Sequence, residues 1–313
     1  MRDIATARVE DLIGPVAGAE PAVRPIPLPN GARVAFTIQV ALEAWTGATI
    51  SGPTLPIGPD GEPSLDWATV STQLYGPRTG AARLMRTIDE RGLRACIHLS
   101  ALVAERWPDL VAGMANKGHE IVGHGYRQDE RMGNLDEQRD LEVVRRCTRI
   151  IEAVTGQPPV GWSSHGSRRG PYTVLSLLKE GYIYTRDFRD SDIPYVAAQL
   201  GDRRLLAMTR TDEINDMFIV THHGGSPSVY VEYFKRAFDQ LYAEGETEPK
   251  VMTCVAHSTI FGRPWGASAL AECLDYAAQF EGVWQTTGRE VAEYYLAQLP
   301  ALAAPEVVAA GAR

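Results

Sequence analysis

The stretch "RACIHLSALVAERWPDLVAGMANKGHEIVGHG" at residues 94–125 contains two apolar runs separated by a helical segment. The runs at 94–100 and 119–125 are typical of buried strands, and the segment at 101–118 has a helical pattern that ends at a glycine. A chain that repeats this alternation forms a parallel sheet covered by helices. The stretch therefore predicts an α/β fold.

The same alternation extends along the chain in both directions. Further strands are predicted at 32–42, 160–166, 182–187, 251–258 and 282–287, and further helices at 79–92, 135–156, 172–181, 228–245, 266–280 and 288–300. Because no repeat or linker divides them, we expect a single domain at 31–300, a (β/α) barrel of seven or eight units. An N-terminal arm at 1–30 and a C-terminal tail at 301–313 flank it, and a segment at 51–80 with several Pro and Gly is expected to be a long loop.

The composition limits the classes of partner. The 313 residues are 44% hydrophobic and 22% charged, with a net charge of −8 that argues against nucleic acid or an anionic membrane. No apolar run approaches the ~20 residues that span a bilayer, and the N-terminus lacks an apolar signal core, so we expect a cytoplasmic protein. The four widely spaced cysteines are expected to be buried, reduced thiols.

In a (β/α) barrel the active site lies at the carboxyl ends of the strands. The polar residues that follow the predicted strands are Glu43, His98, His124, His165, Asp187 and His257. Imidazoles and carboxylates gathered at one mouth are the groups that general acid–base chemistry requires. We therefore expect the site to be built from these residues.

Three of them are the strongest candidates for catalysis. His124 lies between two glycines, which let a ligand approach closely, although a loop histidine bonded to the backbone would fit the same pattern. His257 ends an apolar run, as a general acid or base would. Glu43 precedes Trp45, and a carboxylate beside an aromatic wall can act as a base; a partner for an arginine is the alternative.

The spacing of His124 and Gln128 raises the question of a metal. Side chains four residues apart share one side if the chain turns helical, and a zinc site would need histidine at both positions. Further along, His165 and Arg169 could clamp a carbonyl or carboxylate, or form a solvated basic loop. Asn215 and Asp216 could recognise an amide, or simply form a turn.

Several short motifs, taken in order, resemble one family. They are "GHEIVGHGYR", "GW" at 161–162, "LLKEGYIYTRDFRDSDIPY", "NDM", "AFDQLYAEGETEPKVM", and "HSTIFGRP" followed by "LDY". The series resembles the polysaccharide deacetylase superfamily over roughly residues 30–297, and within it the branch of metal-independent allantoinases of urate catabolism. The resemblance implies a distorted (β/α) barrel.

The resemblance also bears on the metal. Metal-dependent deacetylases use an Asp pair after the first strand and a His-x-x-x-His pair, and these positions fall on Gln39, Ala41, His124 and Gln128 here. One histidine cannot hold a catalytic zinc, which needs about three protein ligands. The allantoinase branch carries a carboxylate where Glu43 stands and a histidine before "GRP", as His257 is here. The loop "HGSRRGPYT" departs from that branch, so the resemblance does not extend to allantoin itself.

The sequence thus predicts a metal-independent hydrolase of non-peptide carbon–nitrogen bonds, most simply one that opens a small cyclic amide, imide or ureide. Water would be activated by His124 or Glu43, and His257 would protonate the leaving nitrogen or polarise the carbonyl. The expected substrate contacts are Trp162, His165, Arg127, Arg169, Asn215, Gln39, Gln128 and Arg263. No cofactor is expected, and the resemblance implies a homotetramer. The alternatives are a metal-dependent carbohydrate N-deacetylase and a non-catalytic ligand-binding homologue.

Overall fold

A computed structural model of the protein describes residues 25–46, 58–61, 66–222 and 225–299, and in this part nine strands form one curled sheet. The strands are β1 (Val34–Leu42), β2 (Cys96–Leu99), β3 (Glu120–Gly123), β4 (Gly161–Trp162), β5 (Tyr184–Thr185), β6 (Tyr195–Leu200), β7 (Arg203–Ala207), β8 (Lys250–His257) and β9 (Val283–Thr286). Their order is β6-β7-β5-β4-β3-β2-β1-β8, and β9 pairs with β1. The pairings are parallel except for that of β6 with β7.

Strand β1 lies next to last in this order, and its side chains contribute to both faces of the sheet. It pairs along nearly its whole length with β8, while β9 and β2 share its other edge. Because successive side chains of a strand point to opposite faces, Ile38 and Val40 join the apolar core beneath the helices. Gln39 and Ala41 face the inside of the curled sheet, and Glu43 continues that inner row past the end of the strand.

The segment after β7 closes the sheet against β8. Thr209 donates its hydroxyl hydrogen to the carbonyl of Val251, and the Val255 N–H donates to the carbonyl of Ile214. Asn215 then forms a parallel bridge with Val255. The contacts follow β8 along its length, so the curled sheet becomes a distorted barrel. The predicted α/β barrel is confirmed, whereas the antiparallel hairpin of β6 and β7 was not predicted.

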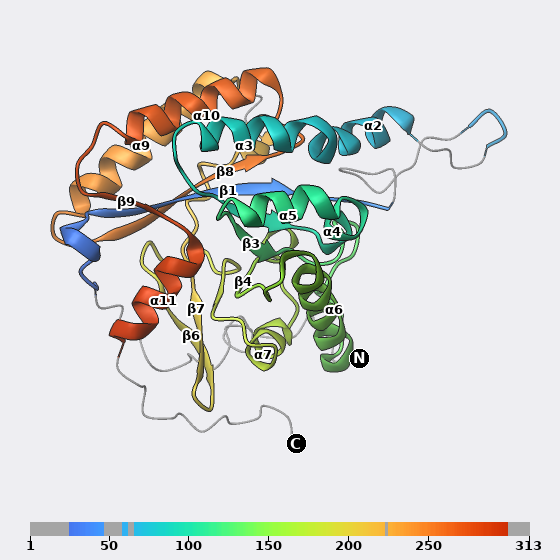
Figure 1. The fold of residues 1–313 in the computed structure, drawn as a ribbon, viewed down its shortest axis with the longest axis horizontal. Coiled ribbons are helices and arrows are strands. Elements are labelled where there is room, and N and C mark those ends of the chain that lie inside the picture. Colours follow the sequence, from blue (N-terminus) through green and yellow to red (C-terminus); the bar gives the residue numbers. More distant parts are fainter. Residues whose placement is uncertain (1–24, 47–57, 62–65, 223–224, 300–313) are drawn as a thin grey trace.

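Helices cover the outside of this barrel, and Figure 1 shows α3, α9 and α10 together over β1 and β8. The helices are α2 (Trp67–Tyr75), α3 (Ala81–Asp89), α4 (Ala101–Arg106), α5 (Pro108–Asn116), α6 (Glu137–Thr155), α7 (Thr173–Lys179), α8 (Asp216–His222), α9 (Pro227–Glu244), α10 (Pro264–Ala277) and α11 (Gly288–Gln298). Strands and helices therefore form two concentric layers, with the apolar core between them.

Two sequence predictions are wrong in ways that shape the site. The helix expected at 101–118 is divided at Trp107 (φ −135°, ψ 58°), because Pro108 lacks an N–H and restricts the residue before it. The loop expected at 51–80 is helical over 67–80, where α2 continues through a π-helical turn into α3. Asp66 starts this helix, since its carboxylate accepts the N–H groups of Ala68 and Thr69.

Several expectations fall outside the described residues. These include the arm up to residue 24, the segments at 47–57 and 62–65, and the tail at 301–313. All four cysteines are buried and free, as expected. Among the helices described, none has the length and apolar character needed to cross a bilayer.

Candidate active site

Glu43 lies at the mouth of the barrel between two histidines. Its side chain follows β1 on the inner row, and the residue is only 7% exposed. One carboxylate oxygen, Oε1, lies 3.3 Å from Nε2 of His124 and 4.0 Å from Nε2 of His257. Parallel pairing explains the grouping, because β1, β3 and β8 all end at this mouth. Three of the residues predicted at strand ends thus come together.

The hydrogen bond of His124 with the backbone of Ser163 fixes the hydrogen on one of its ring nitrogens. Its Nδ1 is 2.5 Å from the carbonyl oxygen of Ser163, which can only accept, so Nδ1 carries a hydrogen and donates it. Nε2 lies 3.3 Å from Glu43 Oε1, so the same ring also contacts the carboxylate. The Ser163 carbonyl therefore holds the ring of His124 against Glu43.

His257 is held by Asp216, a fully buried residue at the start of α8. Asp216 Oδ1 accepts from the Nδ1–H of His257 at 2.6 Å, and Oδ2 accepts from the backbone N–H groups of His257 and Phe261 at 2.7 and 3.2 Å. Burial alone would lower the pKa of His257, but the charge and hydrogen bond of Asp216 raise it to about 9. His257 is therefore an imidazolium at neutral pH.

The same surroundings keep Glu43 ionised. Burial would raise the pKa of this carboxyl group, but the hydrogen bond of His124 and the positive charge of His257 together lower it below its usual value. A carboxylate and an imidazolium thus face each other across 4.0 Å in a buried mouth. One can take a proton and the other can give one at the same pH.

Polar atoms without a partner lie further inside the barrel. Among the described residues, Gln39 Oε1, Ser163 Oγ and both ring nitrogens of His98 are buried and have no hydrogen-bond partner in the protein. The ring of His98 lies 6.0 Å from that of His124, centroid to centroid. Burial and the nearby charge of Arg186 hold the pKa of His98 well below its usual value. Buried polar atoms are normally paired with protein or ordered water, so these mark positions for water or substrate atoms.

The residues at this mouth do not fit the metal centre of the metal-dependent deacetylases. Gln39 and Ala41 supply no carboxylate there, and the Gln128 amide donates to the Ser100 hydroxyl at 3.2 Å. Within residues 25–46, 58–61, 66–222 and 225–299, no group of three or more His, Cys, Asp or Glu side chains is arranged to hold a metal ion.

Three other predicted contact residues are engaged with the protein itself. His165 places Nδ1 2.8 Å from the Glu130 carbonyl and Nε2 2.6 Å from the His124 carbonyl, so its ring fastens the loop after β4 to the strand end. Trp162 is fully buried and packs edge-on against Tyr182 in the core outside the sheet. Asn215 accepts two N–H groups at the start of α8.

The predicted arginines lie on loops around the mouth. Arg127 donates to the Thr46 hydroxyl at 2.6 Å. The guanidinium of Arg169 lies 5.1 Å from the ring centre of Phe188, and that of Arg263 lies 4.4 Å from the ring centre of Tyr75. These side chains are partly exposed, and the structure does not bring them into the Glu43 cluster.

A cavity of about 210 Å³ opens beside Glu43. Its wall includes Trp45, Trp67 and Trp107, which come from the end of β1, the start of α2 and the junction of α4 with α5. Sequence reasoning missed Trp67 and Trp107 because it placed the first in a loop and the second inside a helix. The Asp66 cap and Pro108 were the signals that could have found them.

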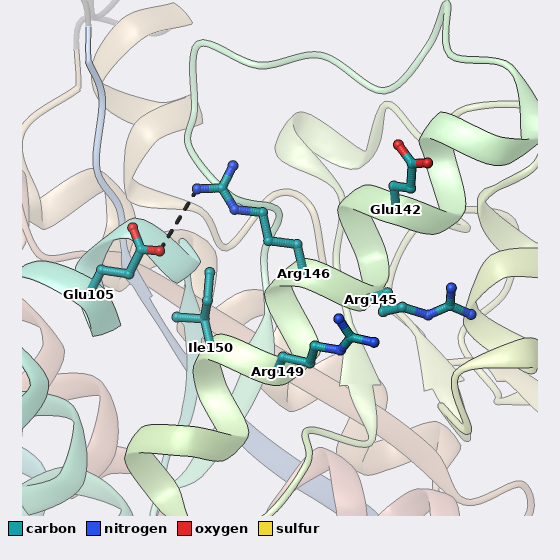
Figure 2. Close-up of a pocket in the computed structure, with 6 residues that line it drawn as sticks. All are labelled: Glu105, Glu142, Arg145, Arg146, Arg149 and Ile150. Carbon is teal, nitrogen blue, oxygen red and sulfur yellow. Dashed lines mark ion pairs between the residues drawn. The ribbon is translucent and has the colours of Figure 1, made fainter.

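A second cavity, of about 460 Å³, lies between the end of α4 and α6. Figure 2 shows Arg145, Arg146 and Arg149 projecting from α6, with Arg146 directed to Glu105. The Arg146–Glu105 pair is 3.8 Å apart, and its side chains are 53% and 39% exposed. Charged side chains line this cavity, but Glu43, His124 and His257 are not part of its wall.

Known sequences and structures are similar to this chain over most of its length. The family model described as polysaccharide deacetylase matches residues 72–184. An allantoinase with a crystal structure, Puue, is 30% identical with a TM-score of 0.80, over 94% of this chain and 99% of that one. The "probable Polysaccharide deacetylase" of Pseudomonas aeruginosa PAO1 is also 30% identical with a TM-score of 0.80, over 93% and 98%. A "Putative polysaccharide deacetylase" of Schizosaccharomyces pombe is 27% identical over 72% of this chain and 75% of its own length.

The chain belongs to the polysaccharide deacetylase superfamily, a family of hydrolases of amide carbon–nitrogen bonds. Its similar proteins include both an allantoinase and deacetylases. Membership therefore supports hydrolysis of an amide bond as the class of reaction, and leaves the substrate open.

Proposed function

We propose that the protein is a metal-independent amidohydrolase that opens a small cyclic amide, imide or ureide. The observation that carries this proposal is the Glu43 carboxylate held 4.0 Å from an imidazolium that Asp216 maintains. The pair supplies a base and an acid together, which hydrolysis of an amide needs when no metal activates the water. Gln39, Ala41 and Gln128 stand where the metal-dependent deacetylases carry their Asp pair and second His, which supports the metal-free route.

Glu43 is the base in this mechanism. Its carboxylate takes a proton from a water molecule as the water oxygen attacks the substrate carbonyl carbon. His124 contacts the same carboxylate and thereby fixes its orientation. His98, neutral and unpartnered in the described protein, offers an N–H to the carbonyl oxygen as negative charge develops there.

His257 is the acid. When the carbon–nitrogen bond breaks, the imidazolium gives its Nε2 proton to the leaving nitrogen, which would otherwise depart as an unstable anion. Glu43 is then protonated and His257 is neutral. The proton returns from Glu43 to His257 across the short gap between them, which restores the starting state. Asp216 does not react; it holds the ring and its charge.

Hydrolysis of hydantoin, dihydrouracil, succinimide and allantoin, with and without a chelator, tests the proposal. We expect ring opening of at least one of these compounds, unchanged by the chelator, in protein with less than one metal ion per ten chains by elemental analysis. Acetate release from N-acetylglucosamine oligomers that stops on chelation would instead establish the metal-dependent deacetylase. Unchanged activity in Glu43→Gln would contradict the proposed mechanism.

A further inference from the structure

We propose that the cavity beside Glu43 is a subsite for an aromatic ring attached to the substrate. The inference rests on the proposed function, because Glu43, the proposed base, also forms part of the cavity wall. Most of the remaining wall is apolar, and includes Trp45, Trp67 and Trp107. A small polar ring alone would leave these indoles without a role.

The exposure of Trp67 points to a ligand. It is 71% exposed at the first position of α2, where Asp66 already caps the helix, so the fold does not require an indole there. An exposed large apolar side chain at the rim of a pocket gains free energy when a ligand covers it. Trp107 faces the same cavity because Pro108 interrupts the helix. Two independent features of the backbone thus bring indoles to one place.

The size of the cavity fits one ring system. An apolar cavity of about 150 Å³ is enough to take benzene, and this one is about 210 Å³. Its connection to Glu43 means that a ring placed here would be joined through a short link to the carbonyl being attacked. A hydantoin with a benzyl group at carbon 5 has this form.

The polar groups of the wall argue against a sugar ring. A sugar presents hydroxyl groups around its rim and needs free hydrogen-bonding partners. Thr46 already donates to Asp129 and accepts from Arg127, so its hydroxyl hydrogen is not available to a sugar. An aromatic ring needs only the indole faces and edges.

The test compares 5-benzylhydantoin with unsubstituted hydantoin in the full chain. We expect kcat/KM to favour the benzyl compound by about tenfold or more, mainly through KM, since the ring adds binding common to ground and transition states. Trp67→Ala, and separately Trp107→Leu, should bring this ratio near one. Trp284→Phe should keep the wild-type ratio, because β9 pairs with the opposite end of β1 from Glu43.

Equal or reversed preference in the wild type would overturn the subsite, as would chitooligosaccharide binding that Trp67→Ala abolishes. If neither hydantoin is hydrolysed, the proposed function fails for these rings, and calorimetric binding decides the subsite by itself. Tighter binding of 5-benzylhydantoin than of 5-methylhydantoin, by about tenfold and lost in Trp67→Ala, supports it. Equal binding, or none, rejects it.

Discussion

The cavity beside Glu43 and the cavity between α4 and α6 both bring carboxylates and cations together, but their surroundings differ. The second is about 460 Å³ against about 210 Å³, and Figure 2 shows its arginines along one helix. Its Glu105–Arg146 pair is more than a third exposed on both sides. Glu43 and His257 are 7% and 9% exposed, and their pKa values move in opposite directions. Burial, rather than volume or the number of charges, separates a reactive pair from a solvated one.

The difference has a physical cause. Water screens exposed charges, so an ion pair at the surface contributes about 0–1 kcal/mol and holds neither partner firmly. In the buried mouth, Asp216 has His257 as its partner through two hydrogen bonds, and removal of one charge leaves the other unpaired. The two cavities should therefore respond very differently to the loss of one charged group.

The largest effect should come from Glu43→Gln. The amide keeps the shape of the side chain but cannot take a proton, so we expect kcat to fall by about 10³-fold or more on the best cyclic substrate. Glu142→Gln, in the wall of the second cavity, is the matched control and should keep activity within about twofold. Comparable losses in the two variants would remove the distinction between the cavities.

Asp216→Asn should have the next largest effect. Without the carboxylate, burial dominates and the pKa of His257 falls, so less imidazolium is present at neutral pH. We expect kcat/KM to fall about 10²-fold, and its alkaline limb to move down from near pH 9. A pH profile of each protein measures this shift, with circular dichroism to check the fold. An unchanged alkaline limb would show that His257 is not the acid.

The stability of the folded chain should also depend on His257. Its folded pKa is raised from 6.5 to about 9, so the stabilisation is fully present below about pH 6.5 and is lost as pH rises through 9. The shift corresponds to about 3 kcal/mol of unfolding free energy. Denaturant titrations of the wild type and His257→Gln should differ most below pH 6.5 and converge above pH 9. A difference that stays constant across this range would contradict the coupling.

The barrel and most of its proposed catalytic side chains could be predicted because they follow local patterns. Glu43, His124 and His257 each come directly after an apolar run, and parallel strands bring their ends to one mouth. The role of Asp216 as the partner of His257 could not be assigned in this way, since the contact joins residues 41 positions apart and begins in a segment without periodicity. Trp107 required attention to one proline, whose effect on the backbone outweighs the helical pattern around it.

The smallest effect should come from Arg146→Gln in the second cavity. The substitution removes the 3.8 Å pair with Glu105 and the contact with the Tyr126 ring, 3.5 Å from the guanidinium carbon to the ring centre. Since both charged groups are well exposed, screening limits the pair, and we expect a loss below about 1 kcal/mol in unfolding free energy and no change in kcat/KM beyond twofold. Denaturant titration and the ring-opening assay measure both. A tenfold loss of activity here would mean that this cavity, too, contributes to catalysis, and that burial is not what separates the two sites.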